Sequence, residues 1–284
     1  MRRIVHLSDL HFGRADCRLE APLLAAIGDL APDLVVVSGD LTQRARHSQF
    51  AAARAFLDRL PAPVLSVPGN HDTPLDNLLV RFLAPFGRYR QHIATELEPL
   101  HRDAEMIVAG VNSVNRFAWQ QGRIGRGRLA RLSARLSGPP GAGQTAPDDP
   151  LRVAVLHHPL EQSPDSHKRL MRGAGETLRA LSDCGADLVL SGHLHLAAAH
   201  PFRAAPGLLF VQAGTGLSTR LRGGERNTFN QIDAHGPRLE VTTWAAEQVG
   251  AEARSLVFAP AARSDWQRGP EGWTALPTGI LSGR

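Results

Sequence analysis

Short apolar runs alternate with amphipathic segments along the first quarter of the chain. Residues 2–8 (RRIVHLS), 32–39 (PDLVVVSG) and 62–69 (APVLSVPG) are apolar and rich in β-branched side chains, which predicts buried strands. Residues 18–31 and 47–61 carry apolar positions at helical spacing. The order strand, helix, strand, helix, strand predicts βαβ units and a largely parallel sheet.

The rest of the chain continues this pattern less regularly. We expect further strands over 105–113, 151–159, 186–195 and 207–215, and helices over 125–136 and roughly 173–184. Residues 229–245 are typical of an antiparallel hairpin. Residues 73–104 indicate loop and helix over the sheet edge, and 137–150 a Pro/Gly-rich surface connection. The tail from 247 shows no clear period.

Composition narrows the class of protein. With 284 residues and 43% apolar side chains, the chain can bury a sizeable core. Two cysteines, Cys17 and Cys184, exclude a disulfide framework, and the N-terminus lacks the apolar stretch of a signal peptide. We therefore expect a cytoplasmic protein without a spanning helix. The net charge of +5 favours an anionic substrate but makes no strong case for nucleic acid.

Polar clusters of one chemical kind follow five of the predicted strands. They are Asp9-Leu10-His11, Gly39-Asp40, Gly69-Asn70-His71-Asp72, His157-His158-Pro159 and Gly192-His193-Leu194-His195. Most of these clusters are, taken alone, typical of a turn or loop. The last is a stronger signal, because two histidines separated by one residue face the same side of an extended segment. In open parallel sheets, however, ligands bind outside the carboxyl ends of the strands, so we expect all five clusters to meet at one edge.

The residue types in these clusters indicate a metal site. Carboxylate, imidazole and amide oxygen suit Mn, Fe, Zn, Co or Ni, and the absence of cysteine argues against a structural zinc site. Seven or eight candidate ligands exceed what one ion needs. They predict two divalent ions that share a carboxylate and lie about 3.5–4 Å apart.

Together the motifs SDLHFG, GDLTQ, PGNHD, LHHP and SGHLH resemble the calcineurin-like metallophosphoesterase superfamily over residues 9–195. Residues 213–232 are most similar to bacterial class III cyclic-nucleotide phosphodiesterase-like proteins. The resemblance implies an α/β fold, a four-layer αββα sandwich of two mixed β-sheets flanked by helices. It also implies a metallophosphoesterase domain over 1–246, with a C-terminal extension, 247–284, that packs on or trails from it.

The resemblance further implies a role for each motif residue. One metal would be held by Asp9, His11 and His195, the other by Asn70, His157 and His193, with Asp40 bridging them. His157 is preferred to His158 because the family places its ligand two residues before the proline. His71 would stabilise charge on the phosphate or protonate the leaving oxygen. Asp72 would orient the loop, or cap the following helix.

The function implied is hydrolysis of a small-molecule phosphodiester, with 3′,5′-cyclic nucleotides as candidates, by in-line attack of a metal-bridging hydroxide. The favoured metals are manganese, or iron together with manganese or zinc. A homodimer is compatible with the sequence. One alternative is a hydrolase of lipid-linked pyrophosphate, for which the apolar 73–100 region is a candidate, or of nucleic-acid ends. The other is a non-catalytic binding scaffold.

Two further groups are candidates for the rim of the site. Asn112, Asn115, Arg116 and Trp119 follow one predicted strand, and Arg220, Arg222, Asn227 and Asn230 follow another. For Trp119 we favour ordinary packing, and the second group could equally pair locally. Five arginines between 123 and 135 indicate a solvated helix face more than a phosphate-tracking patch.

Overall fold

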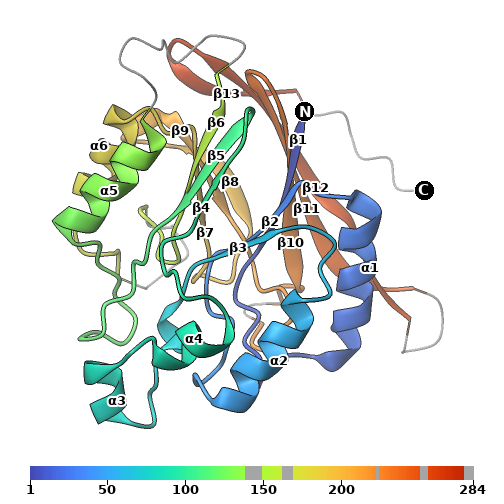
Figure 1. Cartoon of the computed structure of the whole chain (residues 1–284). Coiled ribbons are helices and arrows are strands. Elements are labelled where there is room, and N and C mark those ends of the chain that lie inside the picture. The colour runs from blue at the N-terminus through green and yellow to red at the C-terminus, as the bar shows by residue number, and fades with distance from the viewer. Residues whose placement is uncertain (138–148, 162–168, 222–223, 250–254, 278–284) are drawn as a thin grey trace.

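Two mixed β-sheets lie face to face at the centre of the molecule (Figure 1). The computed structural model describes residues 1–137, 149–161, 169–221, 224–249 and 255–277. The first sheet has the strand order β13-β12-β11-β10-β1-β2-β3. Its strands are β1 (Arg2–Leu7), β2 (Leu34–Val37), β3 (Val64–Ser66), β10 (Thr228–His235), β11 (Arg238–Gln248), β12 (Leu256–Gly269) and β13 (Gly272–Leu276). The first three run parallel, and the other four are joined antiparallel.

The second sheet has the strand order β4-β5-β6-β7-β9-β8. Its strands are β4 (Leu100–Arg102), β5 (Met106–Gly110), β6 (Leu151–Val155), β7 (Leu188–Ser191), β8 (Ala198–Phe202) and β9 (Ala205–Gln212). The four inner strands run parallel, and the edge strands β4 and β8 are antiparallel to their neighbours. Parallel strands buried on both faces explain the continuous apolar runs of the sequence.

Helices cover the outer faces of the two sheets (Figure 1). The helices are α1 (Glu20–Leu30), α2 (His47–Leu57), α3 (Leu78–Leu83), α4 (Gly87–His92), α5 (Arg126–Leu136) and α6 (Ala174–Asp183), with short 3-10 turns η1 (Cys17–Leu19) and η2 (Asn70–Asp72). Side chains of α1 and α2 share a core with β1 and β2, whereas those of α5 and α6 share one with the second sheet. The predicted four-layer sandwich is confirmed.

The strand alternation of β1 shows how the sequence builds these layers. Val5 and Leu7 pack under the first pair of helices, while Ile4 joins a third core between the two sheets. That central core also contains Trp266 of β12 and Trp273 of β13. The C-terminal strands thus cover one end of the inter-sheet space.

The sequence pattern missed four strands, namely β4, β8, β12 and β13. β4 and β8 are short edge strands. β12 begins with the apolar run LVFAPAA, but a proline interrupts this run and most positions of the strand are exposed or half-buried. β12 and β13 extend the first sheet. β11 runs across the domain boundary that we predict between residues 246 and 247, and this division into a domain and an extension stays a prediction. Most of the predicted connection over 137–150 lies outside the described residues. Within the described chain, no helix has both the length and the apolarity to cross a membrane.

Candidate metal centre

The polar clusters that the sequence singled out meet where β1, β2, β3, β6 and β7 end. Each cluster lies directly after the carboxyl end of its strand, as expected for parallel sheets. The seven candidate ligands are all at most 5% exposed, namely Asp9, His11, Asp40, Asn70, His157, His193 and His195. Buried polar groups require interaction partners, and the side chains of these seven residues converge around two points.

Five of these seven residues hold a left-handed backbone. The φ angles are 52° at Asp9, 49° at His11, 52° at Asp40, 72° at His193 and 64° at His195. A non-glycine residue with positive φ is uncommon, and such strain clusters at functional sites. The turns that it produces bend each loop back, so that the side chains face one another across the sheet edge.

Two glycines allow the loops to approach closely. A Cβ atom at Gly69 would collide with the backbone nitrogen and carboxylate of Asp40, and one at Gly192 would collide with Ser8 and Asp9. Any side chain at either glycine would therefore push the ligand loops apart.

The first point of convergence joins three acceptor atoms. Asp9 Oδ1 lies 3.1 Å from His195 Nε2 and 3.6 Å from His11 Nε2, and the two Nε2 atoms are 3.3 Å apart. The opposite nitrogens, Nδ1 of both rings, face the backbone carbonyls of Thr42 and Arg220 at 3.4 and 3.2 Å. Because a carbonyl only accepts, each Nδ1 carries a proton, which leaves each Nε2 as the nitrogen that a cation could bind. A cation at this point would satisfy all three.

The second point lies around His157. Its Nε2 is 3.1 Å from Asn70 Oδ1, 3.3 Å from His193 Nδ1 and 3.4 Å from Asp40 Oδ2, while its Nδ1 donates to the carbonyl of Ser38 at 2.8 Å. Burial disfavours a charged ring, but the Asp40 carboxylate outweighs it and raises the pKa of His157 to about 9. This point attracts positive charge, whether a proton or a metal ion.

Asp40 connects the two points. Its Oδ2 lies 3.4 Å from His157 Nε2 and 3.8 Å from His11 Nε2, and Asp9, Asp40 and His157 could themselves hold an ion. Burial would raise the pKa of both carboxyls. The neighbouring rings, His195 for Asp9 and His157 for Asp40, instead hold each pKa well below its usual value. Both carboxylates are therefore charged and able to bind cations.

His158 lies beside the second point. Its ring centroid is 4.8 Å from that of His193, and its Nδ1 is 2.9 Å from Ser113 Oγ. Nitrogen atoms of His157, His158 and His193 lie close enough together to share an ion. His157 alone of the two neighbours faces Asp40 and Asn70, so it stays the predicted ligand.

His71 lies at the edge of the first point. Its ring meets that of His11 edge-on at 4.9 Å, and its backbone N–H donates to Asp40 Oδ1 at 2.8 Å. Nδ1 lies 2.9 Å from the carbonyl of Gln43, and Nε2 lies 3.4 Å from Arg220 Nη1. Burial lowers the pKa of His71, although Asp40 counteracts it. The Gln43 carbonyl thus occupies Nδ1, while the Nε2 edge of the ring faces Arg220.

Asp72 holds two ligand loops together from behind. Its carboxylate accepts from the backbone N–H groups of Leu41, Thr42 and Gly69 at 3.2, 2.8 and 2.9 Å. The helix that follows is capped instead by Asn77, whose side chain accepts from Val80. This geometry is that of a residue that orients the loops.

Sequence reasoning missed Gln43, whose carbonyl fixes the His71 ring and whose Oε1 lies 3.5 Å from Arg220 Nη1. Its position at the end of the GDLTQ motif was the available signal. Arg220 does reach the centre, whereas Asn227 and Asn230 bond locally to backbone carbonyls. Arg222 lies outside the described residues.

The other rim candidates lie away from the two points. Asn112 is buried and bonds to the backbone of Val114, while Asn115 and Arg116 line a separate groove. Trp119 is 62% exposed beside Arg81.

Comparisons with known proteins agree with this geometry. The family model described as calcineurin-like phosphoesterase matches residues 2–197. Over 80 residues the chain is 35% identical to glycerophosphodiester phosphodiesterase GpdQ of Enterobacter lignolyticus (strain SCF1), a match that covers 24% of this chain and 29% of that protein. The chain thus matches under a third of that relative's length.

Solved structures share the fold at low sequence identity. A purple acid phosphatase, PPD1, from yellow lupin (Lupinus luteus) seeds superposes with a TM-score of 0.66 at 13% identity, covering 99% of this chain and 57% of that one. PhoD gives 0.70 at 9% identity, with 99% and 72% covered. A dimetal phosphatase from Danio rerio gives 0.62 at 12%, with 92% and 99% covered.

Proposed function

The chain belongs to the calcineurin-like phosphoesterase family, and on this premise we propose that it hydrolyses a phosphate diester with the help of two divalent metal ions. The observation that carries the proposal is the convergence of buried acceptor atoms on two adjoining points. Local similarity to a glycerophosphodiester phosphodiesterase supports a diester over a monoester. Cyclic nucleotides are the first natural substrates to screen, because residues 213–232 resemble class III phosphodiesterases.

The donor set fits two ions. Asp9, His11 and His195 would hold one, Asn70, His157 and His193 the other, and Asp40 would contact both. Hard and borderline donors without thiolate suit manganese, iron or zinc. Bound there, the ions would supply a water of lowered pKa and neutralise phosphate charge.

Side chains of the protein would then position the substrate and assist departure of the leaving group. His71 points Nε2 toward the space beside the first point, where it can stabilise a phosphate oxygen or deliver a proton to the leaving oxygen. Arg220 offers a guanidinium on the same side, suited to a phosphate oxygen. Asp72 acts as a positioning residue, since it touches only the loops.

The test compares bis(p-nitrophenyl) phosphate with p-nitrophenyl phosphate, with Mn²⁺ and then with chelator. We expect metal-dependent cleavage that favours the diester. His71→Ala should lower kcat about a hundredfold to ten-thousandfold, with unchanged metal content, and Arg220→Gln should chiefly raise KM.

His235→Ala provides the matched control, because His235 is an exposed residue at the turn between β10 and β11. It should leave both rates unchanged. If the protein binds two ions and turns over neither ester with any divalent metal, the proposal is wrong. That result would favour the binding-scaffold alternative.

A further inference from the structure

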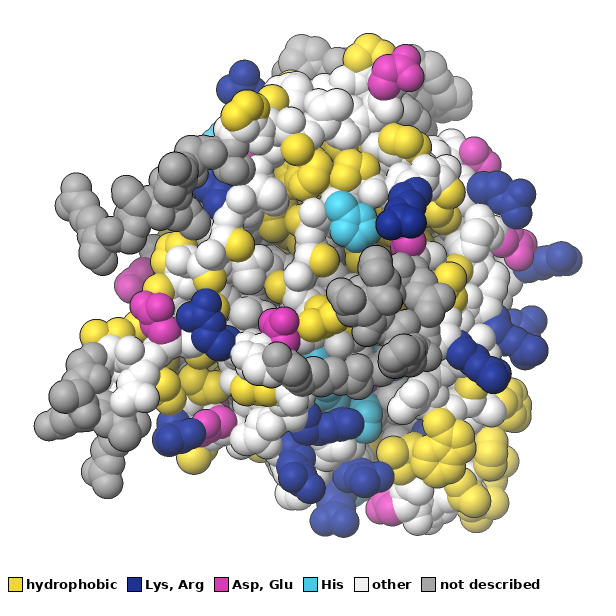
Figure 2. Space-filling model, turned by 180° about the vertical axis from the view of Figure 1, so that it is seen from behind, with side chains coloured by type: hydrophobic (Ala, Val, Ile, Leu, Met, Phe, Trp, Pro, Cys, Tyr) yellow, Lys and Arg dark blue, Asp and Glu magenta, His cyan; other side chains and the backbone are white. Residues whose placement is uncertain are grey.

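Six large apolar side chains are exposed near one another on one part of the surface. They lie on α3 and on the loop after β5, and each is between 40% and 74% exposed. We call them the α3 patch, which consists of Leu78, Leu79, Phe82, Leu83, Phe117 and Trp119. Figure 2 shows hydrophobic side chains gathered at the lower right of the molecule, the region of α3. A contiguous apolar surface of this kind marks an interaction site.

A buried arginine holds the two halves of the α3 patch together. Arg81 is 2% exposed, and its guanidinium donates to Thr73 Oγ1 at 2.6 Å and to the carbonyls of Arg116 and Ala118 at 3.1 and 2.9 Å. Phe82 also stacks on Phe117, with ring centroids 5.8 Å apart. The apolar side chains are thus presented by a fixed framework, and not by a loose loop.

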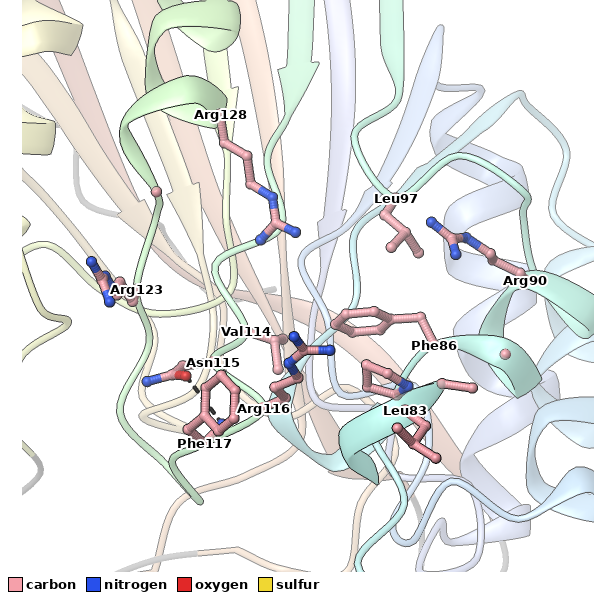
Figure 3. Close-up of a pocket in the computed structure, with 14 residues that line it drawn as sticks. Leu83, Phe86, Arg90, Leu97, Val114, Asn115, Arg116, Phe117, Arg123 and Arg128 are labelled. Carbon is pink, nitrogen blue, oxygen red and sulfur yellow. Dashed lines mark hydrogen bonds between the residues drawn. The ribbon is translucent and has the colours of Figure 1, made fainter. Parts of the chain in front are cut away.

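An arginine-lined groove of about 580 Å³ adjoins the α3 patch. Leu83 and Phe117 belong to both surfaces. In Figure 3 the guanidinium groups of Arg90, Arg116 and Arg128 point into the space between α3–α4 and the loop leading to α5, with Arg123 at its outer edge. No acidic residue lines the groove within the described chain.

The charge of this groove is largely uncompensated. Arg128 Nε lies 3.2 Å from Glu98 Oε1, and it is the one groove arginine paired with a carboxylate among the described residues. Arg116 bonds to a backbone carbonyl, that of Phe82, and lies over the Phe117 ring. The groove therefore presents positive charge next to an apolar surface.

We propose that the α3 patch and the adjoining groove dock the protein on an anionic lipid surface. Leucine, phenylalanine and tryptophan enter the boundary between head groups and acyl chains, while nearby arginines contact lipid phosphates. A second copy of the chain fits less well. A twofold axis through the patch and the groove would bring the uncompensated arginines of the two copies toward one another.

This inference is independent of the proposed hydrolysis, because it concerns binding alone. It has a consequence for the site, since Thr73, which anchors Arg81, follows Asp72 directly in the chain. Docking would bring the edge that holds the metal centre close to the lipid surface.

The test is co-sedimentation of the full chain with vesicles of equimolar phosphatidylcholine and phosphatidylglycerol, beside vesicles of phosphatidylcholine alone. We expect binding to the anionic vesicles that weakens with salt. Leu79→Ser/Leu83→Ser should weaken it about tenfold, and Arg90→Gln and Arg123→Gln about fivefold each. The fluorescence of Trp119 should shift to the blue on binding, a shift that Trp119→Phe removes.

Matched controls lie elsewhere on the surface. Leu100 on β4 is 45% exposed, and the Arg203 side chain is 85% exposed, so Leu100→Ser and Arg203→Gln should bind as the wild type does. Absence of vesicle binding, or binding that the patch variants leave unchanged, would overturn the proposal. So would a dimer in sedimentation velocity that Leu79→Ser/Leu83→Ser converts to monomer, because a second copy would then cover the patch.

Discussion

At the scale of single residues, His6 on β1 is a buried histidine whose pKa differs between the folded and the unfolded protein. This ring is fully buried, and its Nε2 lies 2.9 Å from Ser38 Oγ. Burial lowers its pKa to about 3, although Asp9 counteracts the shift. His6 is therefore neutral in the folded protein, whereas it takes up a proton near pH 6.5 when unfolded.

This difference makes stability depend on pH in a definite direction. Because the folded pKa is depressed, the contribution of His6 is complete above pH 6.5 and is lost as pH falls toward 3. Between pH 7 and pH 5 it should lower the free energy of unfolding by about 2 kcal/mol. His6→Gln, which cannot titrate, should lack this part of the loss when urea unfolding is compared at the two pH values. An identical pH dependence in both proteins would contradict the assigned pKa.

The residue scale also shows what could be predicted from sequence. The identity of the ligands was accessible because each follows an apolar run that ends in a polar motif. The left-handed backbone of Asp9 or His193 was not, since such residues give no local signal of the kind glycine gives. Gln43 was missed for another reason, because it acts through its backbone carbonyl, which every residue has.

At the scale of elements, the turns after the strands decide whether the ligands can meet. Gly69 lies against Asp40, so a methyl group there must displace a ligand loop. We expect Gly69→Ala to lower the bound metal per chain and to destabilise the protein by about 1–3 kcal/mol. Metal analysis after dialysis, together with thermal unfolding, would measure both effects.

Gly175 provides the matched control for this substitution. It lies inside α6, and a Cβ atom there would meet nothing within 4 Å. Gly175→Ala should therefore keep full metal content and slightly raise Tm, since alanine favours a helix. Equal metal content in both variants would mean that the loops near Gly69 can adjust.

Elements also differ in how visible they are to sequence reasoning. The central parallel strands and the helices α1, α2, α5 and α6 were all anticipated, because burial imposes a regular apolar pattern. β12 was not, since it pairs along its length with β11 while most of its side chains are exposed or half-buried. Backbone pairing of this kind depends on a distant partner and leaves little trace in the local sequence.

At the scale of the whole molecule, the C-terminal hairpin joins the two sheets. Trp273 of β13 is 5% exposed in the inter-sheet core, and its indole N–H donates to the carbonyl of Asp187, just before β7, at 3.1 Å. Arg268 of β12 forms an ion pair with the carboxylate of the same residue. The hairpin therefore contacts both halves of the sandwich.

Removing this contact should weaken the entire fold. We expect Trp273→Ala to lower the free energy of unfolding by about 3–5 kcal/mol, because it leaves a cavity in the central core. A chain that ends at residue 246 should be insoluble or unfolded, since it also lacks Trp266. Circular dichroism and denaturant unfolding would measure this. A truncated chain as stable as the full one would instead support a separable extension over 247–284.

The division of the ligands between the two sheets has a consequence for assembly. Each proposed ion position takes donors from both sheets: Asp9 follows β1 and His195 follows β7, while Asn70 follows β3 and His157 follows β6. Neither half of the sandwich supplies the whole proposed donor set of either ion by itself. Metal occupancy would therefore report that the two halves have docked correctly. Each bound ion would also cross-link the two sheets, so that one binding event both completes the proposed catalytic site and stabilises the tertiary structure.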